Sequence, residues 1–250
     1  METDKNLHFG KVNDMKTMIF AFVLAALCTL SLTGCTVPVM TTTDTAAEPS
    51  PVSETAASEL PAEFQGKTVL RMSAEMDRLY APTMDNIVSH ADGAIRGTVQ
   101  GITYTSLGEA SLGKNAWTVI RVKTEKTLAG DIPAGGTLDI YTFGGYIPLR
   151  EKLGDSLEAH GSSMTEEGLD NSVVYQYSDE SALPEIGKTY IFYLVEPNEA
   201  MPQGSYERLC GSYGQLEVGA DGQTLTRVAA DGAIEIYTPQ QLTALNRTVK

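Results

Sequence analysis

The chain has 250 residues, with 18 Lys and Arg against 32 Asp and Glu, which gives a net charge of −14 at pH 7. Nucleic-acid binding and attachment to anionic lipid headgroups both need a basic surface, so the composition argues against both.

An apolar segment near the N-terminus has the length and the flanks of a signal peptide. Residues 19–32 carry no charge, and Lys16 precedes them. A transmembrane helix needs about 20 apolar residues, so this run is too short to cross a bilayer. Two small residues, ending at Gly34, suit cleavage before Cys35. The sequence therefore predicts a signal peptide over residues 1–34.

The sequence Leu32-Thr33-Gly34-Cys35 resembles the lipobox of bacterial lipoproteins. The resemblance implies cleavage between Gly34 and Cys35 and a diacylglyceryl group on the cysteine. Two acyl chains anchor a protein stably, whereas one binds membrane only marginally. An exported protein, lipid-anchored to the cell membrane and facing outside the cytoplasm, is therefore implied. Met15 is an alternative translation start, because acidic residues precede it.

The segment after the cysteine has the composition of a flexible tether. Of the 25 residues from 36 to 60, sixteen are Thr, Ser, Ala or Pro, and none is basic or aromatic. Such a segment cannot bury enough apolar surface to offset its ordering entropy. We expect a tether over 35–61 and one folded domain over 62–250. Cys210 is then the only free thiol, which excludes an intramolecular disulfide and suits a buried, inert residue.

The folded part has the pattern of short strands with little helix. Strands are predicted over 94–99, continuing past a bulge at Gly101 to 102–104, and over 117–124, 137–143, 189–195, 216–218, 225–228 and 234–237. The last three of these strands are expected to close the sheet. The run 189–195 is apolar on both faces, which indicates a central strand. Short helices are predicted at 83–90, capped by Thr83, and at 240–246, after a Thr-Pro-Gln-Gln capping box. This order favours a mainly β barrel or a sandwich.

Four segments resemble, in the same order, those of uncharacterised exported bacterial proteins; they are 91–99, 122–130, 136–140 and 186–194. Those domains are similar in outline to the barrels of tissue inhibitors of metalloproteinases and of netrins. The resemblance implies an OB-like, closed or partly open Greek-key β-barrel with short flanking helices; a β-sandwich is the alternative. The inhibitors use a free N-terminal cysteine amine and several disulfides, which this chain does not share.

Motifs for catalysis or metal binding are weak. Ser111 and Lys114 match the Ser-x-x-Lys spacing of penicillin-binding proteins, but glycines flank them and the partner motifs do not appear. His90 and His160 do not have the spacing of a zinc site. The sequence therefore predicts no catalytic residue, no metal and no cofactor, and we expect a protein that is not an enzyme.

A long segment, 146–184, is predicted as a loop and as the first place to look for binding. It carries an acidic cluster of Glu166, Glu167, Asp170, Asp179 and Glu180, which suits a solvated surface. Connectors of this length are often functional or disordered. It also carries Tyr146, Tyr175 and Tyr177, and exposed tyrosines suit carbohydrate or protein recognition.

The functional expectation is a non-enzymatic binding module at the cell envelope, whose partner is an envelope protein or glycan. One alternative is a hydrolase that attacks envelope polymers through carboxylates, and another is an inhibitor-like module. Two carboxylates in one concave pocket would favour the hydrolase. A flat aromatic patch would favour the binding module.

Overall fold

The computed structural model describes residues 60–74, 78–109, 113–154 and 164–246, which belong to one compact unit spanning 56–250. The predicted signal peptide, Cys35 and nearly all of the predicted tether lie outside the described residues. The elements in chain order are η1 (Ala62–Phe64), β1 (Thr68–Ser73), α1 (Met84–His90), β2 (Gly93–Leu107), β3 (Asn115–Ala129), β4 (Thr137–Phe143), β5 (Gly145–Pro148), α2 (Leu149–Leu153), α3 (Glu166–Asp170), β6 (Ser172–Tyr177), β7 (Thr189–Val195), β8 (Tyr206–Arg208), η4 (Gly211–Gly214), β9 (Gln215–Val218), β10 (Leu225–Val228), β11 (Ile234–Tyr237) and α4 (Pro239–Asn246). No helix in this part of the chain is long and apolar enough to cross a membrane.

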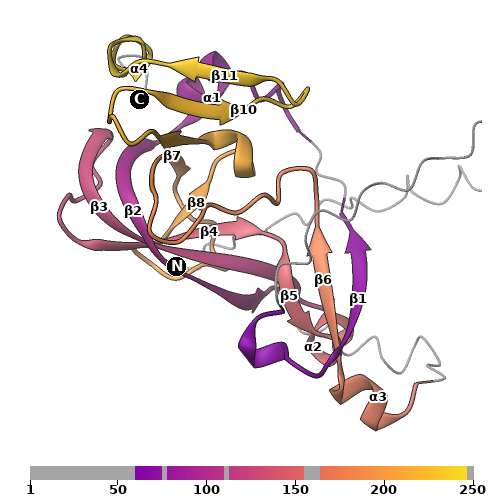
Figure 1. The fold of residues 1–250 in the computed structure, drawn as a ribbon. Coiled ribbons are helices and arrows are strands. Elements are labelled where there is room, and N and C mark those ends of the chain that lie inside the picture. The colour runs from indigo at the N-terminus through magenta and orange to yellow at the C-terminus, as the bar shows by residue number, and fades with distance from the viewer. Residues whose placement is uncertain (1–59, 75–77, 110–112, 155–163, 247–250) are drawn as a thin grey trace, which may run out of the picture. The chain divides into compact units, whose positions relative to one another are not determined.

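An eight-stranded sheet in the order β11-β10-β9-β7-β2-β3-β4-β8 forms the larger part of the fold. Its last strand, β8, pairs in parallel with β4 and in antiparallel with β7. The strands β7, β2, β3, β4 and β8 therefore close into a ring (Figure 1). The predicted mainly β fold, with a partly closed barrel and short helices, is confirmed, and the likeness to OB domains stays a prediction.

Strand β7 lies between two hydrophobic clusters, which explains its apolar sequence. Tyr190, Phe192 and Leu194 point into the barrel, where they join Ile95, Val99, Ile120, Val122, Ile132, Leu138 and Ile140. The alternate residues Ile191 and Tyr193 point the other way, into a cluster with α1 and α4. Successive side chains of a strand alternate between faces. A strand buried on both faces is therefore apolar throughout, as the sequence predicts for 189–195.

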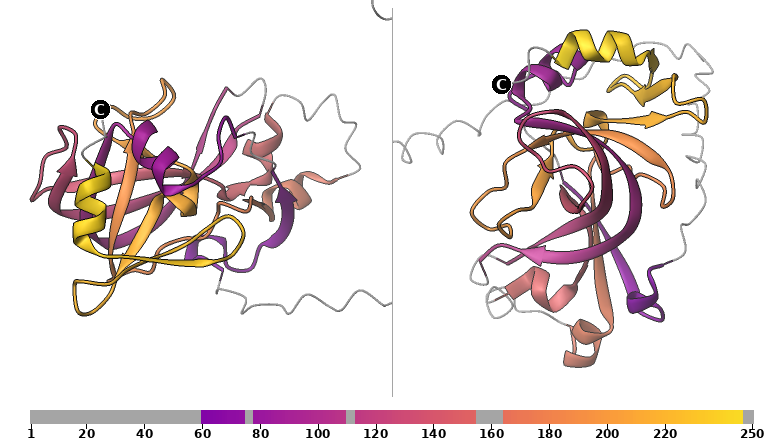
Figure 2. Two further views of the ribbon diagram at one scale, coloured as in Figure 1. Left: turned by 90° about the horizontal axis from the view of Figure 1, so that it is seen from above. Right: turned by 90° about the vertical axis from the view of Figure 1, so that its left-hand side faces the viewer.

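Helices α1 and α4 lie side by side over this second cluster (Figure 2). The Thr83 hydroxyl accepts a hydrogen bond from the Asn86 N–H at 3.4 Å, which caps α1. At α4, the Gln241 N–H donates to the Thr238 hydroxyl, and the Thr238 N–H donates to the Gln241 side chain. This reciprocal pair is the capping box expected from the sequence.

A second, three-stranded sheet in the order β1-β6-β5 packs beside the barrel. The segment 146–184, which the sequence predicts as a long loop, contains most of β5 and all of α2, α3 and β6. The expectation of a plain loop is therefore wrong for this segment. Strand β6 pairs in parallel with β1, which lies about a hundred residues earlier. No local pattern in the sequence indicates a pairing between such distant segments.

Two further details of the large sheet differ from the prediction. The strands β9, β10 and β11 extend the sheet from β7 and do not close it. Closure comes from β8, which has only three residues and no apolar alternation to mark it. The bulge expected near Gly101 is present, because the register of β2 against β3 shifts between Val99 and Gly101.

Candidate functional site

The three tyrosines of the predicted binding segment lie together on one face of the small sheet. Tyr146 in β5 is the register partner of Tyr175 in β6, and their ring centroids are 4.8 Å apart. Tyr177, two residues along β6, stacks on Tyr175 with centroids 5.7 Å apart. Residues two apart on a strand share a face. The strands therefore hold the three rings in a fixed row, where the sequence suggested a loop.

Two more aromatic rings extend this row. Phe64 of η1 packs against Tyr146 at 5.6 Å, and Tyr104 of β2 meets the same ring edge-on at 5.1 Å. Gly145 makes this approach feasible, because a Cβ there would lie 2.6 Å from the Tyr104 ring. We call the set Phe64, Tyr104, Tyr146, Tyr175 and Tyr177, together with Arg71, the tyrosine face.

Burial changes the acidity of the phenols in the tyrosine face. It raises the pKa of Tyr104 to about 12, and it also raises the pKa of Tyr175. These two side chains are therefore neutral at physiological pH and keep their hydroxyl protons. A neutral phenol both donates and accepts hydrogen bonds, and its ring offers apolar contact.

Arg71 of β1 supplies a positive charge to the tyrosine face. Its guanidinium carbon lies 5.4 Å from the Tyr175 centroid and 5.8 Å from the Tyr177 centroid. Within the described residues Arg71 makes no ion pair. The guanidinium therefore keeps N–H groups that could donate hydrogen bonds to a carboxylate of a partner.

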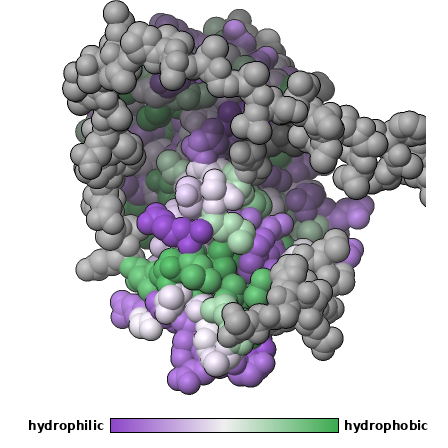
Figure 3. All heavy atoms as spheres, turned by 90° about the vertical axis from the view of Figure 1, so that its right-hand side faces the viewer, coloured by the Kyte–Doolittle hydropathy of each residue, from purple (hydrophilic) through white to green (hydrophobic). Residues whose placement is uncertain are grey.

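Strand β1 is exposed at all six of its positions. Among the described residues it pairs only with β6, so its other edge is free. The exposed fraction is 39% for Val69, 38% for Leu70 and 40% for Met72. Figure 3 views the side of the domain where β1 and β6 lie in Figure 1, and it shows a hydrophobic patch with hydrophilic residues around it.

The backbone hydrogen bonds of β1 show which of its N–H groups face this free edge. The N–H groups of Thr68 and Ala74 both donate to carbonyls of the β6 side, at 2.8 Å. Because orientation alternates along a strand, the N–H groups of Leu70 and Met72 also face β6. Those of Val69, Arg71 and Ser73 then face the free edge.

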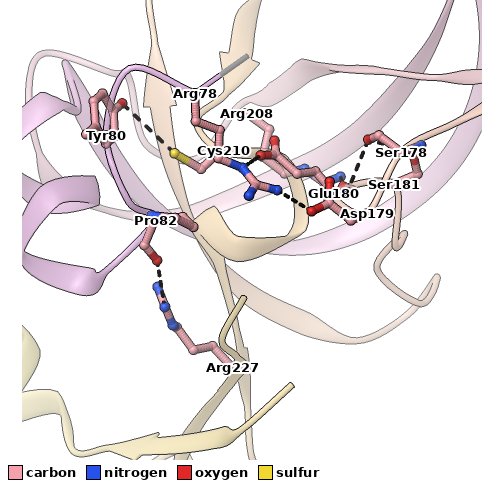
Figure 4. Close-up of polar contacts among 10 residues, drawn as sticks. All are labelled: Arg78, Tyr80, Pro82, Ser178, Asp179, Glu180, Ser181, Arg208, Cys210 and Arg227. Carbon is pink, nitrogen blue, oxygen red and sulfur yellow. Dashed lines mark hydrogen bonds and ion pairs between the residues drawn. The ribbon is translucent and has the colours of Figure 1, made fainter. Parts of the chain in front are cut away.

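A second candidate site is the crevice beside Glu180, drawn in Figure 4. Arg78 forms ion pairs with both Asp179 and Glu180. The predicted acidic cluster is therefore divided, since Glu166 and Asp170 pair with Arg150 elsewhere. These carboxylates lie in ion pairs, where the sequence suggested a solvated loop.

Buried polar groups support the crevice from below. Arg208 is 2% exposed, and it donates to the Thr142 hydroxyl at 3.0 Å and to the Gln215 side chain at 2.6 Å. Desolvation lowers its pKa, since burial penalises the charged form.

Cys210 has a φ of 52°, which is left-handed backbone. Burial raises the pKa of its thiol, so the sulfur is protonated and a poor nucleophile, consistent with the inert thiol that the sequence predicts.

One carboxyl of the crevice is not held by an arginine in the described residues. Glu207 and Glu180 line a cleft of about 350 Å³ together with Tyr80 and Cys210. Desolvation raises the pKa of Glu207 above its ordinary value. Two carboxyls whose environments differ are the arrangement that acid–base catalysis uses. The crevice is therefore the place where the alternative of a hydrolase can be tested.

The other residues considered in the sequence fall in scattered positions. His90 stacks on Tyr80 with centroids 4.0 Å apart, at the end of α1. Lys114 pairs with Glu151 at 3.3 Å, whereas Ser111 lies outside the described residues, as does His160. Within the described part of the chain no three His, Cys, Asp or Glu side chains are grouped to hold a metal ion. The predicted absence of a metal or cofactor stays a prediction.

Sequence reasoning identified the tyrosines of β5 and β6 and missed the rest of the tyrosine face. Arg71 and Phe64 come from the first fifteen described residues, where no element was predicted. The alternation in Thr68–Ser73 was the available signal, with Val69 and Arg71 on one face and Leu70 and Met72 on the other.

Comparison with protein-family models and with curated proteins found no match to this chain.

Proposed function

We propose that this protein is a lipid-anchored module that binds another protein of the cell envelope, outside the cytoplasm, through the tyrosine face and the free edge of β1. The observation that carries this proposal is the juxtaposition of five aromatic rings, an arginine that has no ion pair among the described residues, and an exposed strand edge. Tyrosine and arginine are enriched among the residues that dominate binding energy at protein interfaces.

The free edge of β1 favours an extended segment of a protein as the partner. A strand edge carries unpaired N–H and C=O groups that another strand can pair with. Val69 and Arg71 lie on the side of β1 that joins the tyrosine face, so an added strand would place side chains over the rings. Arg71 favours a segment that brings a carboxylate, which complements its charge.

The anchor part of the proposal depends on the lipobox at Leu32–Cys35. A diacylglyceryl group on Cys35 would hold the chain on the membrane, and the Thr/Ser/Ala/Pro-rich segment would separate the domain from it. Random-coil dimensions of about 5–6 Å times the square root of length give this segment a reach of roughly 25–30 Å. A Cys35→Ala variant should stay unprocessed and should not incorporate labelled fatty acid; normal labelling would contradict the anchor.

The binding proposal is tested by capturing the partner with full-length protein in chemically cross-linked native cells. Arg71→Glu reverses the charge over the tyrosine face, and Val69→Pro removes an N–H that faces the free edge. Both should lose one and the same partner, identified by mass spectrometry. The matched control Lys126→Glu makes the same charge change at an exposed position of β3 and should keep that partner. Retention of the partner by Arg71→Glu and Val69→Pro would contradict the proposal.

A second candidate function, hydrolysis of an envelope polymer, is favoured by one observation. Glu207 has a raised pKa and shares a cleft with Glu180, which Arg78 holds in an ion pair. Glycoside hydrolases use two carboxyl groups, one as the acid and the other as the nucleophile or base. If this candidate is right, purified native protein releases reducing ends from isolated cell-wall polymer, and Glu207→Gln abolishes the release. No release by the native protein removes this candidate.

A further inference from the structure

A polar cleft on the outer wall of the barrel shares no lining residue with the tyrosine face or with the crevice. Its volume is about 580 Å³, within the range of roughly 300–1,000 Å³ that is usual for ligand pockets. The cleft is lined from three neighbouring strands and from the connection between β7 and β8. The side chains that concern the argument are Gln100, Arg121, Thr137, Asp139, Tyr141 and Gln203.

The β-bulge of β2 contributes one of these side chains. Val99 is the register partner of Val122 and Gly101 that of Arg121, so Gln100 is the extra residue without a partner in β3. Bulges redirect a side chain and are common beside functional sites. Gln100 is exposed, and its amide lines the cleft. This register shift, one of three between β2 and β3, therefore places Gln100 at the cleft.

A small apolar cluster supports the cleft and fixes its wall. Val119, Tyr141 and Met201 pack together on the outside of β3 and β4, and Trp117 packs against them. Met201 belongs to the connection between β7 and β8, so this contact fixes the connection on the barrel. Gly204 follows in left-handed backbone with a φ of 79°, and the Ser205 hydroxyl donates to the Pro202 carbonyl at 2.6 Å. The wall formed by this connection is therefore preorganised.

The charges in the cleft cancel each other. Arg121 and Asp139 are register partners on β3 and β4, and two parallel hydrogen bonds of 2.9 and 3.0 Å join them. A bidentate pair fixes the guanidinium and the carboxylate in one plane. This pair does not use all the N–H groups of the guanidinium or all the lone pairs of the carboxylate. The unused groups remain available for hydrogen bonds to a ligand. The remaining polar groups, from Gln100, Gln203 and Thr137, are uncharged.

We propose that this cleft binds a neutral saccharide. Amides, a threonine hydroxyl and a self-neutralised Arg–Asp pair offer donors and acceptors side by side, which matches the neighbouring hydroxyls of a sugar. A charged ligand would have to compete with the ion pair already formed, and the net charge of −14 further disfavours an anion. The proposal goes beyond partner binding at the tyrosine face, because it needs none of the residues of that face.

Ligand binding to the cleft can be followed through the fluorescence of the single tryptophan. Trp117 packs against the cluster below the cleft, and the chain contains no other tryptophan. Full-length protein in detergent would be titrated with the neutral tetrasaccharides maltotetraose, cellotetraose and tetra-N-acetylchitotetraose, and with tetragalacturonate as the acidic comparison. Intrinsic fluorescence and isothermal calorimetry would both be followed. We expect saturable binding of at least one neutral tetrasaccharide and at least fivefold weaker binding of tetragalacturonate.

Variants of the lining residues test whether the sugar binds in this cleft. Gln100→Ala removes the side-chain amide, and Arg121→Lys removes the planar guanidinium. Each should weaken binding of the neutral sugar at least fivefold. Lys126→Gln, outside the cleft, should bind as the native protein does. Melting curves identify any variant that fails to fold, and the exposed Gln100 position should tolerate alanine. Absence of neutral-sugar binding, a preference for tetragalacturonate, or unchanged binding in Gln100→Ala would each overturn the proposal.

Discussion

The barrel and the small sheet differ most clearly in how they bury their strands. β7 is buried at its five central positions, whereas β1 is exposed at all six. Both strands carry apolar residues, but only those of β7 lie in a core. Burial of a large apolar side chain contributes about 1.5–3 kcal/mol, so β7 stabilises the fold and β1 contributes little. The exposed apolar side chains of β1 therefore suit the proposed binding of a partner better than a role in the core.

A second difference lies in the backbone. In the ring of the barrel, β8 pairs with strands on both of its sides and thereby closes the sheet. In the small sheet, β1 has one partner within the described part of the chain and leaves one edge open. Exposed edges are a liability that proteins usually cover, twist or charge. Arg71 is the only charged residue of β1, so this edge is only weakly protected.

The largest expected effect comes from the barrel core. Phe192→Ala removes a side chain that is 0% exposed in the cluster inside the barrel. Such truncations cost about 3–5 kcal/mol. The same truncation type on the small sheet, Val69→Ala, should change the free energy of unfolding by less than about 1 kcal/mol. Urea unfolding of both variants measures the contrast, and equal losses would show that β1 is part of the core.

A smaller effect is expected from the pairing of β1. Leu70→Pro removes an N–H that faces β6, and it leaves a carbonyl of β6 without its donor. The loss of one ladder hydrogen bond costs about 1–2 kcal/mol. Hydrogen exchange should become faster in β1 and β6 and stay unchanged in β7. Protection that falls equally in β7 would show that the two sheets unfold as one unit.

The smallest effect concerns Glu207, at the edge of the barrel. Its pKa is raised by desolvation, so the folded protein keeps the proton to higher pH than the unfolded chain does. The folded state then binds more protons in the window above the ordinary glutamate pKa of about 4.3, and stability falls as the pH rises through that window. Glu207→Gln should remove this fall.

Thermal melting between pH 4 and 8 provides the measurement for this variant. The exposed Glu199→Gln serves as the control and should melt with the pH dependence of the native protein. An unchanged pH dependence in Glu207→Gln would mean that Glu207 is solvated in the folded protein. That result would also weaken the case for the crevice as a hydrolase site.

The sequence predicted those parts of the fold whose patterns are local. The central strand β7 and the strand β4 have the predicted limits of 189–195 and 137–143, because burial and alternation are visible within a few residues. The caps of α1 and α4 were also predicted, because a capping box needs only four neighbouring residues. Features that depend on distant pairing were missed, namely the parallel pair of β1 with β6 and the closing strand β8.

The candidate site divides in the same way. Tyr146, Tyr175 and Tyr177 were selected from the composition of one segment. Their row depends on the register of β5 with β6, and Arg71 joins it only through the pairing of β1. The bulge near Gly101 was expected from glycine alone. Its role in presenting Gln100 to a cleft depends on the fold of the connection between β7 and β8.

The central claim is that a protein partner occupies the tyrosine face, and site-specific photo-cross-linking tests it most directly. A photoreactive phenylalanine would replace Tyr177, an exposed ring of the face, in full-length protein in native cells. The matched probe would replace Ile236 of β11, which is 66% exposed on the edge strand of the large sheet. We predict a discrete covalent adduct with one envelope protein from position 177 and none from position 236. No adduct from position 177, or the same adduct from both positions, would contradict the claim.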